Sequence, residues 1–335
     1  MLARVLDALA PAHVVDEHGE IHARANGRSV EPGDALVVAT SGTTGDPKGV
    51  VLTHDAVAAS ARATSRRIGI DHERDHWLAC LPLAHIGGLS VVTRAVVTDT
   101  ALTVHAGFDA AAVRDAAIAG CTVTSLVSTA LARIDAALFR VIVLGGARPP
   151  ADRPANTVTT YGMTETGSGI VYDGMPLDGV EVRLSVDGEI AVRGPMLLRT
   201  YRDDSDPKTS DGWLPTGDLG EWDADGRLVV HGRRGDLIIT GGENVWPDAV
   251  EAVLRDLSGV ADVAIAGRPD AEWGVRVVAY VVARDPGAPP PLDELRDAVR
   301  AVLPAYCAPR ELQLVASIPR TALGKPRRSE LTDAS

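Results

Sequence analysis

Residues 40–50 read Thr-Ser-Gly-Thr-Thr-Gly-Asp-Pro-Lys-Gly-Val and follow directly on the apolar run at 35–39. This order predicts a strand that leads the backbone into a loop rich in hydrogen-bond donors. Glycines let a backbone approach a ligand closely, while hydroxyls and a lysine add donors that suit phosphate oxygens. The stretch is not a Walker A loop, because no Lys-Ser/Thr pair follows a glycine at the required spacing. We therefore predict a phosphate-binding loop of another kind.

From about residue 34 to 145, apolar runs alternate with Ala-rich stretches of helical spacing. The predicted strands are 35–39, 76–81, 101–105, 122–127 and 139–144, and the predicted helices are 53–68, 87–97, 109–119 and 129–138. Such alternation favours a largely parallel sheet covered by helices on both faces. Asp109 is the expected N-cap of its helix, and Gly120 is expected to end that helix.

After Tyr161 the pattern changes to short apolar runs separated by Asp-Gly pairs, which is typical of β-hairpins. The runs are 180–184, 189–192 and 228–231, and the Asp-Gly pairs are 187–188, 211–212 and 225–226. From about 233 the sequence predicts a compact α+β domain with a stiff connector at Pro286–Pro291. Its expected strands are 237–240, 260–266, 275–282 and 311–315, and its expected helices are 248–257 and 292–303.

These patterns together predict an α/β protein with two domains. The large N-terminal domain is expected at 1–232, with sheet and helix layers to about 160 and a small antiparallel β unit at about 170–232. A smaller, mobile α+β domain is expected at 233–335. A chain of 335 residues is long enough to give both domains ample cores.

The composition is 45% apolar and 23% charged, the balance of a globular protein. A net charge of −12, spread along the chain, argues against nucleic acid or an anionic membrane surface as the partner. Cys80, Cys121 and Cys307 form no metal or redox motif and are expected to be buried, reduced thiols. We see neither a secretory signal nor an apolar run long enough to span a membrane, so a cytoplasmic enzyme is expected.

The stretch at 40–50 resembles the phosphate-binding signature of the adenylate-forming superfamily, which includes acyl-CoA synthetases, luciferases and peptide-synthetase adenylation domains. Further signatures of that superfamily follow in its order, so the resemblance runs from about residue 34 to 330. In this loop it implies that ATP is bound by Thr40, Ser41, Gly42, Thr43, Thr44, Gly45 and Lys48.

Residues 161–165 read Tyr-Gly-Met-Thr-Glu and resemble the Y-G-x-T-E motif of the superfamily. The resemblance implies that Tyr161 stacks on adenine, that Thr164 meets the α-phosphate and that Glu165 holds magnesium. A hard cation prefers a carboxylate oxygen, so this role suits the residue type. The turn at 145–147 resembles the one that passes the adenine edge, although Gly-Gly after a strand is common. The nucleotide-binding residues implied here are Gly145, Gly146, Ala147, Tyr161, Gly162 and Met163.

Three further residues and one three-residue segment match superfamily motifs in the second half of the chain. Asp218 matches the aspartate that holds the ribose hydroxyls, and Arg233 matches an arginine that reaches the nucleotide. Lys325 matches the catalytic lysine that bridges the substrate carboxylate and the α-phosphate and neutralises developing charge. The segment Gly241, Gly242 and Glu243 matches the G-G-E motif beside the pantetheine tunnel of acyl-CoA synthetases, which favours CoA as the acceptor.

Two departures from the superfamily pattern carry expectations of their own. Most members have a large N-terminal portion ahead of the phosphate loop, which here begins at residue 40, so the acyl pocket is expected to be closed with less protein. The hinge position usually holds aspartate or lysine, and here it is identified as Gly235. Glycine permits the rotation but cannot make the usual side-chain contacts.

Residues 81–89 read Leu-Pro-Leu-Ala-His-Ile-Gly-Gly-Leu and resemble a segment of o-succinylbenzoate–CoA ligases, which act in menaquinone synthesis. The resemblance places His85 beside the acyl pocket, and the alternative is a structural histidine at a strand end. Arg94 stands alone in an apolar helix, where it either binds a substrate carboxylate or extends to the surface. Ser168 and Gly169 are predicted to line the pocket for the substrate ring.

The resemblance implies an acid–CoA ligase that acts on o-succinylbenzoate, using Mg-ATP to form an acyl-adenylate and then transferring the acyl group to CoA. Its catalytic residues would be Lys325, His85, Thr164 and Glu165. The predicted partners are a small carboxylic acid, ATP and CoA, and the predicted assembly is a homodimer. The first alternative is a medium-chain or aryl acyl-CoA ligase of the same mechanism. A peptide-synthetase adenylation domain is disfavoured because no carrier-protein segment follows Lys325, and a non-catalytic nucleotide-binding homologue because the motif residues occur together.

Overall fold

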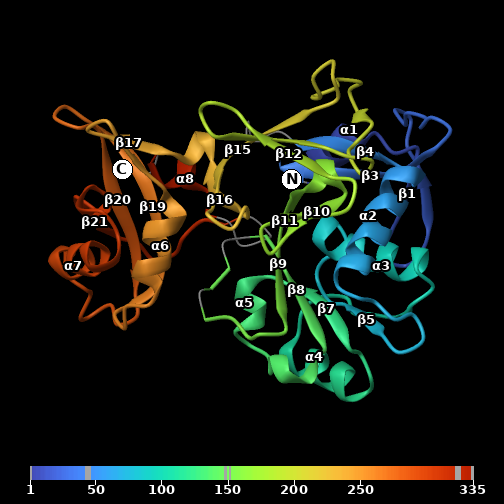
Figure 1. Cartoon of the computed structure of the whole chain (residues 1–335), viewed down its shortest axis with the longest axis horizontal. Coiled ribbons are helices and arrows are strands. Elements are labelled where there is room, and N and C mark those ends of the chain that lie inside the picture. Colours follow the sequence, from blue (N-terminus) through green and yellow to red (C-terminus); the bar gives the residue numbers. More distant parts are fainter. Residues whose placement is uncertain (1, 42–46, 147–148, 151, 321–325, 333–335) are drawn as a thin grey trace. The chain divides into compact units, whose positions relative to one another are not determined.

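The computed structural model describes the chain except for residues 1, 42–46, 147–148, 151, 321–325 and 333–335 (Figure 1). Two compact units make up the fold. The first comprises Met1–Arg183, Ala191–Thr216 and Asp223–Leu228, and the second comprises Leu184–Ile190, Gly217–Trp222 and Val229–Ser335. This division does not fall at a single position, so the expected boundary between 232 and 233 stays a prediction.

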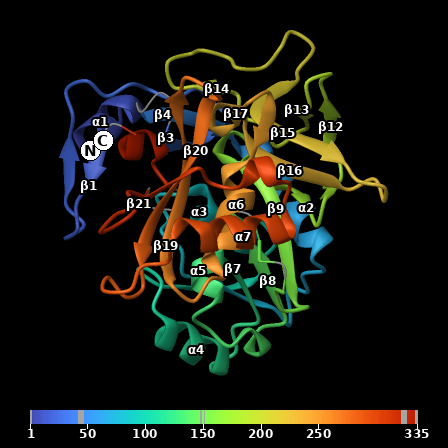
Figure 2. The same cartoon turned by 90° about the vertical axis from the view of Figure 1, so that its left-hand side faces the viewer.

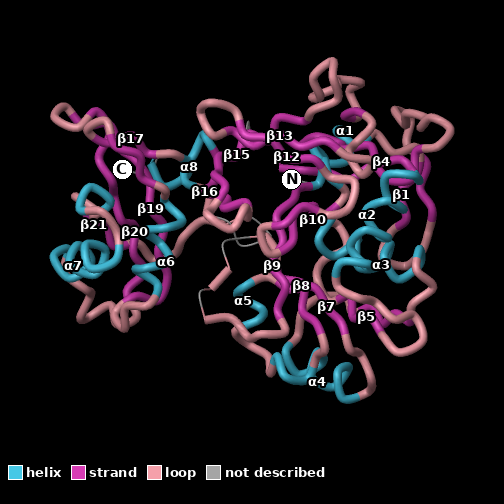
Figure 3. Tube along the Cα trace, viewed as in Figure 1, coloured by secondary structure: helices cyan, strands magenta, loops and turns pink. Residues whose placement is uncertain are grey.

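A seven-stranded sheet forms the centre of the first unit, in the order β11-β10-β9-β8-β7-β5-β6 (Figure 3). In that order the strands are Met175–Pro176, Ser168–Tyr172, Thr157–Met163, Val141–Leu144, Val123–Leu126, His76–Ala79 and Ala101–Val104. Neighbouring strands from β6 to β9 are parallel, whereas β10 and β11 are antiparallel to their neighbours. The predicted parallel-rich α/β architecture is therefore confirmed, with β9 as a strand that the sequence patterns missed.

Helices cover both faces of this sheet because successive side chains along a strand point to opposite faces. The helices are α2 (His54–Arg67), α3 (Ile86–Val97), α4 (Ala110–Ile118) and α5 (Ser128–Leu131). Leu78 of β5 packs with Val113 of α4 and Leu131 of α5. Its neighbour Trp77 instead meets the guanidinium of Arg94 on α3, with 5.7 Å between the guanidinium carbon and the ring centroid. The expected coverage on both faces is confirmed.

Strand β3 (Asp34–Ser41) corrects the expectation that the run at 35–39 joins the parallel sheet. It pairs antiparallel with β4 (Pro47–Thr53), which in turn pairs with the short β14 (Thr200–Tyr201). The reason is the length of the connection: a parallel pair needs a crossover of a dozen or more residues, and only 42–46 separate these strands. The two described ends of the phosphate-loop segment, 40–41 and 47–50, therefore lie on paired antiparallel strands.

The helix predicted at 129–138 is also wrong, because α5 ends at Leu131 and only the 3₁₀ turn η1 (Ala136–Leu138) follows. The Asp135 carboxylate accepts a hydrogen bond of 3.0 Å from the Ala137 N–H and caps this separate turn. The neighbouring α4 begins as expected, since Asp109 accepts a 2.8 Å bond from the Ala112 N–H. Gly120 follows that helix with a φ of +112°, as expected for a helix-ending glycine.

The predicted antiparallel β unit is a four-stranded sheet of order β12-β13-β15-β16. Its strands are Glu181–Leu184, Glu189–Arg193, Leu214–Trp222 and Leu228–Arg233. At the start of the chain, α1 (Leu2–Leu9) precedes the hairpin of β1 (His13–Val15) and β2 (Ile21–Ala23).

The last hundred residues form an α+β fold around β19 (Val260–Asp270), β20 (Gly274–Ala283) and β21 (Glu311–Leu314). Successive side chains along these strands point to opposite faces, so the hydrophobic core lies in two parts, one on each face of the sheet. Helices α6 (Pro247–Arg255) and α7 (Leu292–Val302) cover one face (Figure 2), and α8 (Arg328–Thr332) packs on the other. A two-stranded hairpin of β17 (Ile238–Thr240) and β18 (Glu243–Val245) and the 3₁₀ turns η3 (Arg234–Asp236) and η4 (Ala305–Cys307) complete it.

All three cysteines are free and buried, as predicted. Burial raises the pKa of each thiol, which keeps the sulfur protonated and unreactive. Within the part of the chain that the structure describes, no helix combines the length and apolarity needed to cross a membrane.

Candidate active site

The hairpin of β3 and β4 holds the two ends of the phosphate-loop segment. Thr40 pairs with Lys48 and Ser41 pairs with Pro47 across the two strands. The predicted ligands Gly42, Thr43, Thr44 and Gly45 lie outside the described residues. The Lys48 ammonium lies over the ring of Tyr201, 4.7 Å from its centroid. Tyr201 belongs to β14, the strand that pairs with β4, so the sheet fixes the ring beside the lysine.

Tyr201 also connects this lysine to the predicted magnesium ligand. Its hydroxyl donates a 3.0 Å hydrogen bond to Oε1 of Glu165. Glu165 lies in the 3₁₀ turn η2 (Thr164–Thr166), where its carbonyl accepts a 2.7 Å bond from the Leu198 N–H. Thr164 is half-buried in the same turn. The buried Thr166 hydroxyl bonds the Ser168 carbonyl at 2.6 Å and stabilises the turn.

The donor set at this turn fits a divalent cation. Oxygen Oε2 of Glu165 has no hydrogen-bond partner among the described residues, while Oε1 is oriented by Tyr201. Magnesium is usually held by one or two carboxylates together with substrate phosphates and water. A second protein residue that orients the ligating carboxylate is also typical of metal sites. Tyr201 lies in none of the sequence motifs, and only the pairing of β14 with β4 brings it to Glu165.

Tyr201→Phe is expected to weaken magnesium activation by about tenfold, because loss of an orienting partner typically costs about 10- to 100-fold in metal affinity. The phenyl ring still packs over Lys48, so the change isolates the hydroxyl. The measurement is the Mg²⁺ concentration that gives half-maximal pyrophosphate release at saturating ATP and acid. Tyr306→Phe, in the second unit, is the matched control. An unchanged Mg²⁺ requirement in Tyr201→Phe would refute the orienting role.

The predicted adenine-site glycines lie where β8, β9 and β10 pack at close range. Gly145 and Gly146 follow β8, and Ala147 lies outside the described residues. Gly162 faces Gly169 across the β9–β10 pair. A Cβ on Gly162 would lie 2.2 Å from the Ser168 carbonyl oxygen, so this position accepts only glycine. The half-buried Tyr161 and Met163 flank it on β9.

Gly162→Ala is expected to destabilise the first unit by at least about 1–3 kcal/mol, the usual cost of overpacking, because the clash is with backbone. Urea unfolding of the ligand-free protein, followed by tryptophan fluorescence, measures the loss. Gly107→Ala is the control, because no atom lies within 4 Å of the added Cβ. Equal stability of the two variants would contradict the close approach of β9 and β10.

Arg94 is buried in the first unit, with only 3% of its surface exposed. It donates to the hydroxyls of Ser125 at 3.4 Å and of Tyr172 at 3.3 Å, and its Nε has no hydrogen-bond partner. The described residues include no carboxylate within ion-pair distance of it. The alternative in which the Arg94 side chain extends to the surface is therefore wrong. A buried guanidinium with only neutral protein partners requires an anion or water for compensation.

The predicted ring-pocket residues lie near this buried polar group. Ser168 is buried, and its hydroxyl shares a 2.8 Å hydrogen bond with Ser60 of α2. Gly169 packs against Thr160, whose Cβ would lie 2.8 Å from an added Cβ. Tyr172, which follows on the same strand, shares a 3.1 Å hydrogen bond with Thr64 of α2. Strand β10 therefore links Ser168 to the environment of Arg94.

His85 occupies the N-cap position of α3, where its side chain makes no capping hydrogen bond. Burial lowers the pKa of the imidazole, which keeps the ring neutral near pH 7. A neutral imidazole retains one nitrogen that can accept a proton. The position at a helix start differs from the strand end of the structural alternative, since β5 ends at Ala79.

Asp218 and Arg233 form an ion pair in the second unit. Arg233 Nε lies 2.9 Å from Asp218 Oδ1, and Asp218 is 6% exposed. The two residues lie on β15 and β16, which neighbour each other in the four-stranded sheet. Two residues that the superfamily motifs assign separately to the nucleotide are thus adjacent in space.

Gly241 and Gly242 form the two-residue turn of the β17–β18 hairpin. Both have positive φ angles, +58° and +86°, which is the geometry of a type I′ turn. Thr240 and Glu243 pair on either side of it. Gly235 lies in the 3₁₀ turn η3, and its role as a hinge stays a prediction.

Lys325 lies outside the described residues, although the residues on either side of that segment are fixed. Arg320 and Pro326 form an antiparallel bridge. Arg320 also pairs with Asp262, with Nε 3.1 Å from Oδ2. Arg328, at the start of α8, lies 2.7 Å from the buried Glu251 and 2.6 Å from Asp248. These contacts bring both ends of the lysine segment onto the same small domain.

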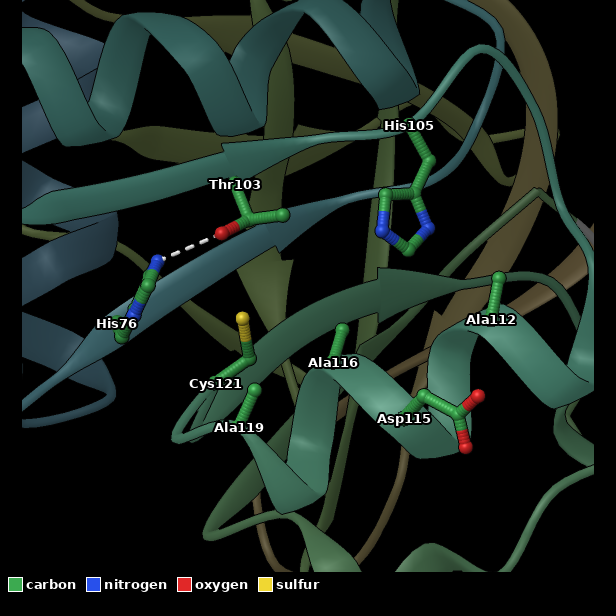
Figure 4. Close-up of a pocket in the computed structure, with 8 residues that line it drawn as sticks. All are labelled: His76, Thr103, His105, Ala112, Asp115, Ala116, Ala119 and Cys121. Carbon is green, nitrogen blue, oxygen red and sulfur yellow. Dashed lines mark hydrogen bonds between the residues drawn. The ribbon is translucent and has the colours of Figure 1, made fainter.

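A separate pocket of about 410 Å³ lies between β6 and α4 (Figure 4). His76 and Thr103 share a 2.9 Å hydrogen bond at its rim, and Cys121 points toward Thr103. None of the predicted site residues lines this pocket. We therefore do not assign the nucleotide or the acid to it.

Comparison with known proteins gives matches along most of the chain. The model of the AMP-binding enzyme family matches residues 4–202, and that of the AMP-binding enzyme C-terminal domain matches residues 249–325. A probable 2-succinylbenzoate–CoA ligase of Mycobacterium tuberculosis (strain ATCC 25618 / H37Rv) is 40% identical, covering 98% of this chain and 93% of the relative. A 2-succinylbenzoate–CoA ligase of Listeria monocytogenes serotype 4b is 35% identical, covering 89% and 70%.

Two solved structures from Bacillus subtilis are similar to this fold. The o-succinylbenzoate CoA synthetase in complex with its acyl-adenylate intermediate has a TM-score of 0.82 at 34% identity, covering 89% of this chain and 69% of that one. The same enzyme with ATP and a magnesium ion has a TM-score of 0.81 at 33% identity, covering 92% and 73%.

Proposed function

The chain belongs to the family of AMP-binding enzymes, and from that premise we propose that it is an AMP-forming acid–CoA ligase acting on 2-succinylbenzoate. Two relatives with this activity in their names match most of the chain at 35–40% identity. The observation that carries the choice of acid is the buried Arg94, which has no carboxylate partner among the described residues. The product class fits menaquinone synthesis, the pathway that the sequence resemblance implies.

The reaction has two steps with a complete balance of atoms. An oxygen of the acid attacks the α-phosphorus of ATP, and pyrophosphate leaves. The thiolate of CoA then attacks the carbonyl carbon of the acyl-adenylate, and AMP leaves. No protein nucleophile is needed, so the residues act by binding, orientation and charge stabilisation.

The residues of the first unit serve the triphosphate and the acid. Lys48 and the loop at 40–45 bind phosphate oxygens, and Thr164 donates to the α-phosphate. Glu165 would hold magnesium, which neutralises the charge of the triphosphate when bound. Tyr161, with the glycines at 145–146 and 162, forms the adenine site. The geometry in support is the contact of Tyr201 with both Lys48 and Glu165.

The residues of the second unit orient the nucleotide and complete each step. Asp218 accepts hydrogen bonds from the ribose hydroxyls while Arg233 holds its carboxylate. Lys325 stabilises the charge that develops at the carboxylate and the α-phosphate. For the second step, we propose that the domain at 233–335 rotates at Gly235. The turn at 241–242 and Glu243 then line the path of the thiol arm, and neutral His85 accepts the thiol proton.

The acid is recognised through two carboxylates, because one reacts and the other must be bound. Arg94 provides a buried guanidinium for the second carboxylate, with Tyr172 and Ser125 orienting it. Ser168 and Gly169, on the same strand as Tyr172, border the aromatic ring of the substrate. An apolar fatty acid would leave the guanidinium uncompensated, which disfavours a medium-chain ligase.

A panel of acids tests this proposal directly. Purified enzyme with Mg-ATP and CoA is supplied with 2-succinylbenzoate, benzoate, 2-butyrylbenzoate or octanoate, and CoA-thioester formation is measured. We expect 2-succinylbenzoate to give the highest kcat/KM. Preference for octanoate or benzoate would instead establish the medium-chain or aryl ligase, and absence of pyrophosphate release with every acid would indicate a non-catalytic homologue.

The domain boundary at 232/233, a cytoplasmic location and a homodimer complete the proposal. Light scattering coupled to size-exclusion chromatography tests the last of these, and a monomer mass near the 35.0 kDa of the chain would refute it.

A further inference from the structure

A buried arginine connects the N-terminal segment 2–30 to the strand that carries Tyr201. Arg202 directly follows β14, and only 8% of its surface is exposed. Its backbone N–H donates a 2.7 Å bond to the Gly49 carbonyl, which continues the pairing of β14 with β4. The main chain of Arg202 is therefore fixed to the residue that follows Lys48.

The Arg202 side chain binds the N-terminal segment, where it donates to three backbone carbonyls. Its Nε lies 3.1 Å from the carbonyl oxygen of Leu9, and its Nη1 lies 2.9 Å from that of Ser29. Its Nη2 donates to the carbonyl of Arg28. Leu9 is the last residue of α1, and the final carbonyls of a helix lack partners within the helix and attract a cation. One guanidinium thus joins the end of α1 to the backbone at 28–29.

The N-terminal segment binds back to the same strand through Arg28. The Arg28 guanidinium donates to the Arg202 carbonyl and to the carboxylate of Asp204. The Arg28 N–H donates a 2.9 Å bond to the Ala10 carbonyl, which holds the chain at 28 against the end of α1. We call the side-chain bonds of Arg202 and Arg28 the arginine clamp. Because each arginine binds the backbone of the other, the clamp fixes the segment and the strand to one another.

The arginine clamp lies directly against the phosphate-loop strand. Helix α1 packs on β3 and β4 (Figure 1). A Cβ added to Gly49 would lie 2.8 Å from Cβ of Arg202 and 3.3 Å from Cδ2 of Leu9. Both residues therefore press on the backbone beside Lys48. A displacement of the clamp would shift β4 at this lysine, because a close-packed contact transmits strain.

The two residues that flank Arg202 in the sequence both interact with Lys48. The Tyr201 ring lies under the ammonium, and the Tyr201 hydroxyl bonds the carboxylate of Glu165. On the other side, hydrogen bonds within its own turn lower the pKa of the Asp203 carboxyl, and the Lys48 charge lowers it further. The position of Arg202 thus sets the position of both neighbours relative to the lysine.

We propose that Arg202 is a positioning residue for the magnesium and phosphate site, with the N-terminal segment 2–30 as its support. This inference rests on the proposed ligase function and deepens it. Each of the three Arg202 nitrogens donates to a carbonyl of the segment, so the residue acts through Tyr201 and not on the nucleotide. A group that binds a ligand must be held near its productive geometry by the residues behind it, and such support raises affinity without touching the ligand.

Arg202→Met tests the proposal through the Mg²⁺ concentration that gives half-maximal pyrophosphate release. We expect this concentration to rise about tenfold, the lower end of the effect of losing a residue that orients a metal ligand. The same change is then made in Tyr201→Phe, which lacks the hydroxyl to be positioned. There the additional rise should be at most about twofold, because the effects of coupled residues do not add.

Two results would overturn the proposal. One is an unchanged Mg²⁺ requirement in Arg202→Met, and the other is an additional rise of about tenfold in the Tyr201→Phe background. A purely structural role of Arg202 lowers the thermal unfolding temperature but leaves the Mg²⁺ requirement of the folded enzyme unchanged. Arg114→Met on α4 removes an exposed guanidinium elsewhere in the first unit and should leave the Mg²⁺ requirement unchanged.

Further measurements separate this result from folding defects and from failure of the ligase assignment. If Arg202→Met does not fold, Arg28→Gln removes the other side of the clamp. A rise in the Mg²⁺ requirement of about threefold is then expected, in line with a lost hydrogen bond, and no rise would refute the clamp. Absence of acid-dependent pyrophosphate release in the parent protein would refute the ligase function itself. The Kd for Mg-ATP, measured by isothermal titration calorimetry, then tests the clamp without turnover and should rise about tenfold in Arg202→Met.

Discussion

Lys325→Ala is expected to reduce acyl-adenylate formation by about 100- to 1,000-fold, while CoA transfer from a supplied acyl-adenylate largely survives. In the proposed mechanism the lysine stabilises charge that develops only when the carboxylate attacks the α-phosphate, and loss of one such group costs a factor of this size. A supplied acyl-adenylate has already passed the attack on the α-phosphate, so thioester formation from it does not need this stabilisation by the lysine. The measurements are pyrophosphate release in the first assay and thioester yield in the second.

Arg327→Gln is the matched control, since it changes a nearby side chain that pairs with Glu330 at the surface. It should leave both half-reactions close to those of the parent enzyme. Equal loss of the two half-reactions in Lys325→Ala would refute the assignment of the lysine to adenylation. The folded state of each variant is checked by thermal unfolding.

Arg94→Met is expected to lower kcat/KM for 2-succinylbenzoate by roughly 30- to 5,000-fold, the range for removing one partner of a buried charge pair. Two mono-acids each lack one of the two carboxylates, 2-butyrylbenzoate and 4-oxo-4-phenylbutanoate, and the activity with the one that retains the reacting carboxylate should change little. Methionine replaces a buried cation by an apolar side chain, so the fold is expected to tolerate it. The test is the ratio of kcat/KM for 2-succinylbenzoate and for that mono-acid, because this ratio cancels losses common to both.

Tyr172→Phe refines this second prediction. Its hydroxyl lies 3.3 Å from the Arg94 guanidinium and 3.1 Å from Thr64, so its removal leaves the cation present but less well oriented. We expect a loss of about threefold to tenfold for 2-succinylbenzoate, in line with one neutral hydrogen bond. If Arg94→Met lowers the activity with both acids equally, the arginine has a structural role and the second carboxylate is bound elsewhere.

The sequence predicted the core of the parallel sheet well because β5, β7 and β8 are short apolar runs with strong turn signals around them. It failed where local and long-range preferences competed. The run at 35–39 is apolar like the others, yet its partner follows after only a few residues, and β3 pairs in a hairpin. The stretch at 129–138 is Ala-rich, yet Asp135 caps a separate turn and interrupts the helix.

The sequence by itself determined the family and the chemistry, because the residues of each motif are neighbours in the chain and keep their order and spacing. Glu165 and the loop at 40–50 are predicted to bind magnesium and phosphate without any knowledge of the fold. Only the tertiary structure decided how these groups are oriented. Tyr201 lies 36 positions from Glu165, and Tyr172 lies 78 positions from Arg94.

The tertiary structure also distinguished arginines that the sequence alone could not tell apart, because it shows which of them are paired with carboxylates. Arg94 and Arg310 lack carboxylate partners among the described residues, whereas Arg268 and Arg276 share Glu311. Burial and pairing depend on which strands and helices meet, and no local pattern contains that information. The loop at 40–50 thus identified the reaction, and the packing of α3 on the sheet decided that Arg94 is buried without a carboxylate partner among the described residues.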